Sequence, residues 1–463
     1  MKEKFLLMLV AALALTAVPG CSNVQEHETL YEDAHLESIA VGSATQDKYK
    51  VEEPAALGEN PTLSDYLRYA ALNNAGLKAA FEQWKAAVEQ VPQARTLPDP
   101  KFNYGYYIQE VETKVGPQRQ KYGIMQVFPW FGKIEARTDA AAATAKAEKK
   151  RYEATKINLF FEVKDAFYEY TYLASAVETA RENLELIKHF EEVARTKYTA
   201  AAVGHPDVIR AQVELAKLED QLKSLEEMRG PISARLNAVL NRRSFEMLPW
   251  PRKEKFEPVK VNHREMTEML KAKNPELAAM DFEVEAAKSR VELAKKKFWP
   301  DLGVGVDWIQ TDDAVMSGVG DSGKDPIILM FTLNLPVWRD NYRAAHRQAE
   351  ANVRQKAQQK RQAENTIVAR AERALYDFED SFRKIKLYGD ILIPKAEELL
   401  GASETAYKAG TIDFLSLIDA QRMLLKYQLF YERAVADNGQ KLAEMEMLAG
   451  AELTTVKQDS EGE

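Results

Sequence analysis

Few residues of this chain have the type and spacing that catalysis requires. The 463 residues include one cysteine, Cys21, and six scattered histidines, which excludes a disulfide framework, a cysteine-rich zinc site and an iron–sulfur cluster. No HExxH or GxSxG sequence occurs. The glycines from Gly318 to Gly323 imitate a phosphate-binding loop, but Pro326 and a strand pattern follow them where such a loop needs a helix. We therefore interpret this segment as a surface loop.

Acidic and histidine residues between His27 and His35 are the other group with metal-binding atoms. Their spacing is loose and the segment resembles a tether, so a metal site here is the weaker of two interpretations. We predict no catalytic residue, no resident metal and no cofactor, and hence a protein that is not an enzyme.

The cysteine instead marks an export signal. Lys2 and Lys4 precede an apolar run from Phe5 to Val18, which is too short to span a bilayer of ~30 Å but suits the core of a signal peptide. Cys21 follows this run after Pro19 and Gly20, where bacterial lipoprotein signals place the lipidated cysteine. We predict a signal peptide over 1–20 and an acylated, palmitate-bearing Cys21. Ser22, rather than Asp, implies the outer membrane. An ordinary signal peptide with an incidental cysteine is the alternative.

Composition narrows the class further. Hydrophobic residues make up 46% and charged residues 29% of the chain, so it is neither disordered nor a polytopic helical membrane protein. The net charge of −8, without a basic cluster, argues against nucleic-acid binding.

The chain carries two copies of one plan. Asn74 to Leu77 recurs at Asn274 to Leu277, Pro98-Asp99 recurs at Pro300-Asp301, and Tyr198 recurs at Tyr407. These offsets of 200 to 209 need few gaps. We predict a tether over 21–61, repeat 1 over 62–243, a linker over 244–262, repeat 2 over 263–449 and a tail over 450–463.

Each repeat is predicted to run helix, strand, strand, very long helix, turn, helix. The helices are expected at 62–95, 133–200 and 206–242, and again at 263–297, 339–409 and 411–449. In each repeat the two shorter helices together match the long one, so one rod lies beside two half-length rods. Apolar rows at seven-residue spacing, such as Val163, Tyr170, Val177 and Leu184, indicate left-handed supercoiling. A plain two-stranded coiled coil is the alternative.

The strands are expected within 101–128 and 301–335, with outer loops at 110–119 and 311–325. Apolar and polar or small residues alternate in them, for example from Phe102 to Gln109 and from Leu302 to Ile309, as in a transmembrane barrel. A soluble core could also bury the apolar face. Four strands cannot close a barrel, so membrane insertion requires oligomerisation.

Order and spacing together resemble the TolC-like outer-membrane efflux family. The resemblance rests on the lipoprotein signal, the tandem repeats, the Gln126–Lys133 turn and the pattern Tyr407-x2-Gly410 ending in Ala420-Gln421. It implies a mainly α protein with a small membrane β-barrel. Three copies would form a twelve-stranded barrel and a twelve-helix periplasmic tunnel, with the linker and tail around its middle. The implied partners are a periplasmic adaptor (membrane fusion protein) and an inner-membrane pump of the resistance-nodulation-division type, in a Gram-negative bacterium.

The resemblance also implies that the tunnel tip lies at the helix turns near 198–212 and 407–421. Gly204 and Pro206 are predicted to break the first helix pair and Gly410 the second, as a reversal of the chain requires. Threefold symmetry would turn Asp207 and Asp419 into carboxylate rings that favour cations. Helix capping or a solvated first turn is the alternative for each acid. Ser416 stands where some relatives carry a second acid. The remaining candidates are Tyr198 and Tyr407 as tip braces or ordinary buried aromatics, and Gly204, Gly410, Ala211 and Ala420 as adaptor contacts.

The predicted function is therefore a passive export duct whose pump supplies the energy. A periplasmic coiled-coil scaffold lipoprotein is the alternative from another class. An enzyme with helical insertions lacks a catalytic constellation, and an adaptor subunit would carry one helical hairpin instead of two repeats. The sequence leaves heavy-metal and drug cargo open.

Overall fold

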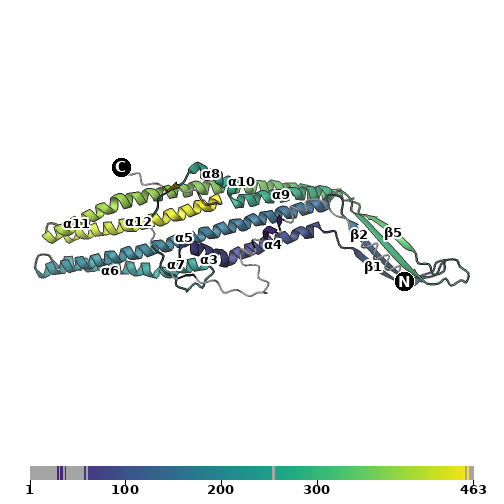
Figure 1. Cartoon of the computed structure of the whole chain (residues 1–463), viewed down its shortest axis with the longest axis horizontal. Coiled ribbons are helices and arrows are strands. Elements are labelled where there is room, and N and C mark those ends of the chain that lie inside the picture. The colour runs from purple at the N-terminus through teal and green to yellow at the C-terminus, as the bar shows by residue number, and fades with distance from the viewer. Residues whose placement is uncertain are drawn as a thin grey trace. The chain divides into compact units, whose positions relative to one another are not determined.

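The computed structural model describes residues 29–30, 32–34, 37, 57–58, 61–252, 256–453 and 456–457. The predicted signal peptide, Cys21, most of the tether and part of the tail lie outside the described residues. The chain divides into two compact units, whose helices and strands are labelled in Figure 1. Unit 1 comprises Met1–Glu37, Glu82–Lys149 and Ala279–Lys360, and unit 2 comprises Ser38–Phe81, Lys150–Ala278 and Arg361–Glu463. Among the described residues, no helix is both long and apolar enough to cross a membrane.

Unit 1 contains a four-stranded antiparallel sheet in the order β1-β2-β4-β5. Its strands are β1 (Lys101–Val111), β2 (Gln118–Phe128), β4 (Leu302–Thr311) and β5 (Ile327–Leu333). The central pair, β2 and β4, joins the two repeats, with Tyr122 opposite Trp308 and Gly123 opposite Asp307. Within the described chain β1 and β5 each pair with one strand only, so the sheet has two open edges.

The predicted alternation divides the sheet into two chemically different faces. Directly opposed residues share a face, and the register places the aromatic and branched residues together. Many of them are exposed, including Phe102, Tyr104, Tyr106, Leu329 and Phe331. The opposite face carries the small and polar residues Asn103, Gly105, Lys121, Gly123, Gly303, Gly305, Asp307 and Thr332, together with the apolar residues Met125, Val127, Ile309, Ile328 and Met330. The sheet therefore has an apolar face that its own chain leaves uncovered.

Four helical segments continue from this sheet in unit 1. They belong to α4 (Ala75–Arg95), α5 (Lys133–Thr199), α9 (Pro275–Lys296) and α10 (Arg339–Lys386). Gln83 of α4 bonds Glu148 of α5, Arg290 of α9 bonds Thr144 of α5, and Lys356 of α10 bonds Glu283 of α9. The helices are thus ordered α4, α5, α9, α10, as the strands that precede or follow them are.

Unit 2 is built around two helical hairpins. Residues 150–199 of α5 turn back into α6 (His205–Glu227), and α11 (Ile393–Ala409) turns back into α12 (Phe414–Ala449). One core joins the hairpins, with Ile187, Phe190, Tyr407, Phe414 and Leu417 at its centre. The predicted seven-residue row Val163, Tyr170, Val177 and Leu184 of α5 is buried throughout, as expected of a row that packs against neighbouring helices.

The other elements of unit 2 surround the ends of the hairpins. They are α3 (Leu63–Asn73), α7 (Arg229–Val239), α8 (His263–Lys273), the end of α10, and the short strands β3 (Val259–Lys260) and β6 (Val456–Lys457), which pair. Part of the predicted linker packs on α5, since Trp250 stacks on Tyr170 with ring centroids 5.2 Å apart.

The predicted helices at 62–95 and 263–297 are wrong in one respect, because each is broken at an asparagine. Asn74 accepts the Leu77 N–H at 2.9 Å and donates to the Val239 carbonyl at 2.8 Å. Asn274 makes the same two bonds, to the Leu277 N–H and the Leu448 carbonyl. An asparagine that caps a new helix satisfies N–H groups that a helix start leaves free. The repeated Asn motif is thus a helix boundary tied to the far end of its own repeat.

Three more predicted helices also differ. The helix expected at 206–242 divides at Met228 between α6 and α7. The helix expected at 339–409 contains a π-helix, Leu387–Leu392, where the Ile393 N–H bonds the Tyr388 carbonyl and Pro394 follows without an N–H. The last helix starts at Phe414 rather than 411, because Asp413 caps it.

Candidate functional site: the two helix turns of unit 2

The turn between α11 and α12 has the geometry that the sequence predicts. Gly410 ends α11 in the left-handed conformation, with φ of +79°, and its N–H bonds the Tyr407 carbonyl at 3.0 Å. Asp413 then caps α12 by accepting the Ser416 N–H at 3.0 Å and the Ser416 hydroxyl at 2.7 Å. These two bonds hold the pKa of Asp413 below its ordinary value. Ser416 is therefore occupied in capping the helix.

The turn between α5 and α6 reverses at a different residue from the one expected. Ala201 has the left-handed backbone, with φ of +55°, whereas Gly204 has φ of −81° and precedes α6 as its N-cap. Pro206 lies in the first turn of α6, where its missing N–H costs nothing. The prediction that Gly204 and Pro206 mark this boundary is confirmed, but the reversal itself is made by alanine.

Each predicted gate acid has an arginine three residues later on the same helix. Asp207 lies 3.4 Å from the Arg210 guanidinium, and Asp419 lies 3.2 Å from that of Arg422. Asp207 is mostly buried at 18% exposure, while Asp419 is exposed at 59%. Within one copy, the two acids are therefore charge-compensated instead of forming bare carboxylates.

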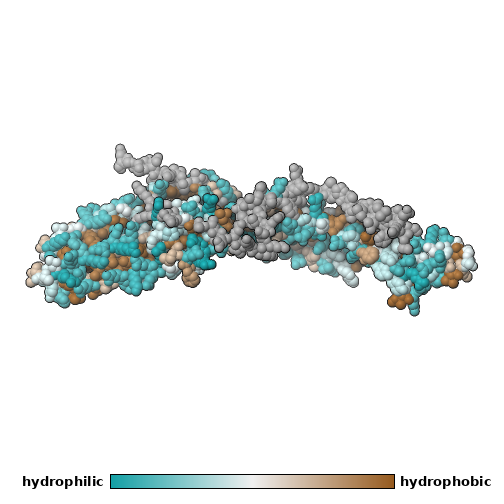
Figure 2. Space-filling model, turned by 60° about the horizontal axis from the view of Figure 1, so that its bottom comes forward, coloured by the Kyte–Doolittle hydropathy of each residue, from teal (hydrophilic) through white to brown (hydrophobic). Residues whose placement is uncertain are grey.

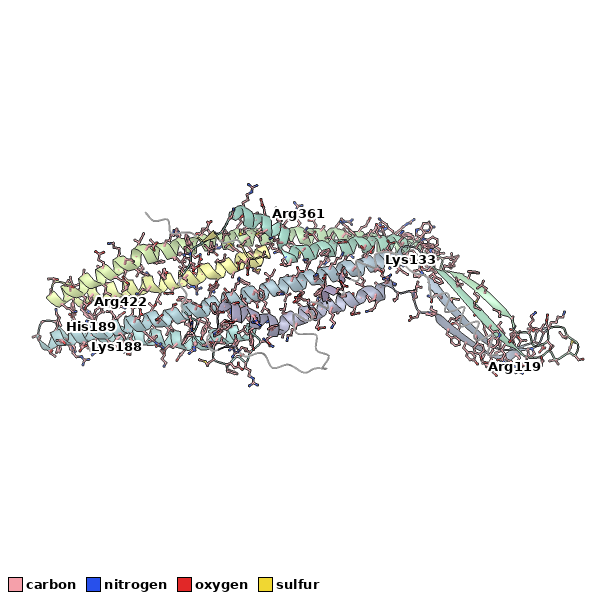
Figure 3. All side chains as sticks on the ribbon, viewed as in Figure 1. Arg119, Lys133, Lys188, His189, Arg361 and Arg422 are labelled. Atoms are coloured by element: carbon pink, nitrogen blue, oxygen red, sulfur yellow. The ribbon has the colours of Figure 1, made fainter. Side chains whose placement is uncertain are left out.

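Arg422 also ties the two hairpins together. Its Nε and Nη2 atoms donate to the two carboxylate oxygens of Glu214 on α6, at 2.8 and 2.5 Å. This fork geometry is the strong form of an arginine–carboxylate pair. It holds the pKa of Glu214 below its ordinary value of 4.5. Figure 3 shows Arg422 and His189 near the end of unit 2 that carries the turns. The Nε2 atom of His189 lies 3.3 Å from the Glu404 carboxylate.

The two predicted tyrosines differ in environment. Tyr407 is 1% exposed and packs edge-on against Phe414 at 5.4 Å, with the Lys197 ammonium 4.8 Å from its ring centroid. Burial and the nearby Asp207 charge raise the pKa of Tyr407 to about 12. Tyr198 is 44% exposed and contacts His205. Only Tyr407 braces the two hairpins, because Lys197 also donates to its carbonyl.

The four predicted adaptor contacts divide in the same way. Gly204 and Gly410 are exposed at the turns. Ala211 and Ala420 are buried in the hairpin core, so their small side chains serve helix packing and present no surface to a partner. This burial argues against the predicted contact through the two alanines.

Sequence reasoning missed Arg210, Glu214 and Arg422. The available signal was the Asp-x-x-Arg spacing that follows both turns, since residues three apart are neighbours on a helix. At the offset of 209 that relates Tyr198 to Tyr407, Arg210 corresponds to Asp419. The two repeats thus place opposite charges at equivalent positions.

The glycine-rich loop that imitates a phosphate-binding loop does not have the geometry of one, and His27 and His35 lie outside the described residues. The loop at 318–324 is followed by Pro326 and β5, not by a helix. In the part of the chain that the structure describes, no group of three His, Cys, Asp or Glu residues could hold a metal ion. Figure 2 shows mainly hydrophilic residues with scattered apolar ones over the hairpin end of unit 2, in the view drawn.

The chain has two repeats of helix, strand, strand and long helix, and its sheet exposes an apolar face. This arrangement is typical of channel subunits in which one chain supplies both the sheet and the helical hairpins. Residues 67–242 and 266–451 match the family described as outer membrane efflux protein. The chain belongs to this family, and it is an outer-membrane efflux channel protein.

Individual relatives are distant. The cobalt-zinc-cadmium resistance protein CzcC of Cupriavidus metallidurans is 21% identical over 84% of this chain and 90% of its own. Nodulation protein T of Rhizobium leguminosarum is 20% identical over 85% and 86%. Among solved structures, CusC has a TM-score of 0.73 at 13% identity, covering 88% of this chain and 99% of its own. The channel OprN has 0.71 at 18%, covering 86% and 94%.

Proposed function

We propose that three copies of the chain close into one duct, with the sheets forming a barrel in the outer membrane and the hairpins a periplasmic tunnel. The observation that supports this most directly is the sheet of unit 1. It has an exposed apolar face and two open edges, and lipid does not tolerate open edges. Four strands per copy and a closed ring satisfy both requirements together.

The duct is passive, and a pump of the inner membrane drives transport through an adaptor that meets the tunnel at its turns. Gly204 and Gly410 are the exposed turn residues available for that contact. The tie between Arg422 and Glu214 and the packing of Tyr407 hold each pair of hairpins together. Opening the tip therefore requires the hairpins to separate against these contacts.

Cys21 anchors the assembly to the membrane through an attached lipid. The proposed barrel also lies in the membrane, so loss of the lipid would weaken the anchoring without abolishing it. Replacement of Cys21 by Ala is accordingly expected to leave the trimer intact. Its mass in detergent checks this, and a monomeric variant would show that the lipid is needed for assembly.

The cargo is a heavy-metal cation or a drug-like molecule. Metal cargo is favoured by the similarity to CzcC, whose name gives cobalt, zinc and cadmium. The similarity to the pyoverdine export protein OpmQ of Pseudomonas putida, 23% identical over 65% of this chain, favours an organic cargo.

Growth of a strain that lacks the gene tests the metal cargo and the organic cargo. Graded cobalt, zinc, cadmium, copper and silver are compared with dyes, detergents and antibiotics, with and without the gene restored. Sensitivity to metals alone identifies the outlet of a metal pump, and sensitivity to drugs alone a multidrug outlet. No phenotype combined with a monomeric mass in detergent would contradict the channel and favour the scaffold lipoprotein.

A further inference from the structure

Unpartnered charges of opposite sign lie on the two outermost helices of unit 1. Arg347 and Arg354 on α10 are exposed and, among the residues that the structure describes, make no ion pair or side-chain hydrogen bond. They lie seven residues apart on one stripe, about 10.5 Å along the axis, with Ala351 between them. Glu89 on α4 is exposed, and its carboxylate likewise has no partner within the described ranges.

The same two helices belong to the open edges of the sheet. Helix α4 leads into β1, and β5 leads into α10. In unit 1 the helix order α4, α5, α9, α10 matches the strand order β1-β2-β4-β5. The open strand edges and the unpartnered charges thus occur together at both ends of one layer. Glu89 has the charge opposite to that of Arg347 and Arg354, while α4 also carries the exposed Lys85 one turn before Glu89. A second copy of the chain fits this arrangement.

The internal repeat supplies the register of such a contact. Within the chain, the joint between repeat 1 and repeat 2 brings α9 against α5, where Arg290 donates to the Thr144 hydroxyl at 3.2 Å. The offset of 207 from Pro129 to Pro336 maps Thr144 onto Ala351. The offsets of 200 from Asn74 to Asn274 and 202 from Pro98 to Pro300 map Arg290 onto residues 88–90, and Glu89 is the central residue of these three. In a closed ring, the joint between repeat 2 and the next copy's repeat 1 is equivalent to the internal one.

The strands give an independent check of this register. In the internal joint, Tyr122 of β2 is opposite Trp308 of β4. The offsets of 207 and 202, taken from the prolines that flank the strands, convert this pair into Leu329 of β5 opposite Tyr106 of β1. Both residues lie on the exposed apolar face. A slip of one residue would put them on opposite faces, so the mapped register, unlike one displaced by a single residue, keeps the apolar face continuous.

We propose that neighbouring copies are joined by an ion pair in which Glu89 of one copy lies between Arg347 and Arg354 of the next. The seam rests on the proposed function, since it needs a closed ring of copies. Ala351 opposite Glu89 lets the helices approach closely, and the arginines one turn to either side reach the carboxylate. This ion pair determines which faces of α4 and α10 meet and how the two helices are aligned along their axes.

Charge reversal tests the seam in the full chain. Glu89→Arg and the double variant Arg347→Glu/Arg354→Glu are each expected to lower the fraction of ring assembly that survives mild heating in detergent about tenfold. Combining all three changes restores it. Glu285→Arg is the matched control, because Glu285 is an exposed glutamate on α9, which has a helix on each side in its own chain. Combined changes that assemble no better than either parent would overturn the seam.

Cross-linking gives a readout that does not depend on variant stability. The chain has one native cysteine, so Glu89→Cys with Ala351→Cys adds a defined pair. A short bis-maleimide is expected to join copies only when both changes are present, and each single variant is the control. An assembled ring without this cross-link would refute the seam. Normal efflux in that case leaves the proposed function standing, whereas a monomeric mass in detergent together with no efflux phenotype would contradict the proposed function and the seam with it.

Discussion

Loss of the fork between Arg422 and Glu214 is expected to loosen the closed tip. Arg422→Ala removes two charge-assisted hydrogen bonds that join α12 to α6. Glu214 is 14% exposed and Arg422 is 44% exposed, so solvent screens part of the interaction and we take its strength as roughly 1 kcal/mol per copy. The second partner of Arg422, the exposed Asp419, adds little.

The size of the effect on gating depends on how many of the Arg422–Glu214 pairs must break before the channel opens. If one tie limits the opening, 1 kcal/mol raises the open population about fivefold, and three acting together give about 150-fold. The assay is single-channel recording in planar bilayers, with open probability as the readout. Arg422→Lys keeps the charge but loses the fork, so it is expected to fall between wild type and Arg422→Ala.

A matched control distinguishes the tie from general charge removal. Arg195 pairs with Glu191 on its own helix α5, so Arg195→Ala removes an equally charged group without separating hairpins. Its open probability is expected to stay at the wild-type level. The reasoning fails if Arg422→Ala records like wild type, or if the control opens the channel as much.

Three further predictions concern pH, a hydroxyl and a glycine. The lowered pKa of Glu214 means that its tie is complete above pH 4.5 and is lost as pH falls through the lowered value; conductance should rise on such acidification in wild type, and Arg422→Ala should lose that response. The Tyr407 hydroxyl is buried without a hydrogen-bond partner among the described residues, so Tyr407→Phe should be neutral or stabilise by up to about 1 kcal/mol in thermal unfolding; a clear loss would reveal a partner. A Cβ on Gly123 would lie 2.2 Å from the Asp307 carboxylate, so Gly123→Ala should cost about 1–3 kcal/mol and reduce assembly, whereas Gly320→Ala, with nothing within 4 Å of its Cβ, should assemble normally.

Periodicity predicted the elements whose packing repeats along the chain. The seven-residue rows of α5 are buried because each row faces a neighbouring helix over many turns. The alternation of residue types in β1 and β4 predicted the two faces of the sheet, because successive side chains of a strand point to opposite faces. At Asn274 the following Pro275 was a boundary signal that the predicted helix ignored. The interruption at Asn74 was harder to predict, because Asn73 and Ala75 on either side of it are compatible with a helix. What breaks the helix there is a bond to a carbonyl more than 160 residues away in sequence.

The candidate site was predicted by position but not by chemistry. Gly410 identified one turn because only a left-handed residue ends the helix there. Asp207 and Asp419 were correctly placed beside the turns, but their arginine partners were not foreseen. The partner of Glu214 lies 208 residues further along the chain, and that pairing depends on how the hairpins pack. Spacing within one helix cannot predict it.

The arginine partners change how the tip should discriminate among ions. A ring of bare carboxylates would attract cations and share protons, whereas Asp207 and Asp419 each face an arginine on their own helix. Closed, such a tip is a network of short-range pairs whose long-range field is small. Its resistance to opening then depends on geometry more than on net charge, because separating the hairpins breaks the Arg422–Glu214 fork while leaving the pairs within each helix intact. Charge selectivity of the open duct would therefore be set mainly by charged groups that lose their partners when the hairpins separate. Glu214 is such a group, because its carboxylate loses the Arg422 guanidinium.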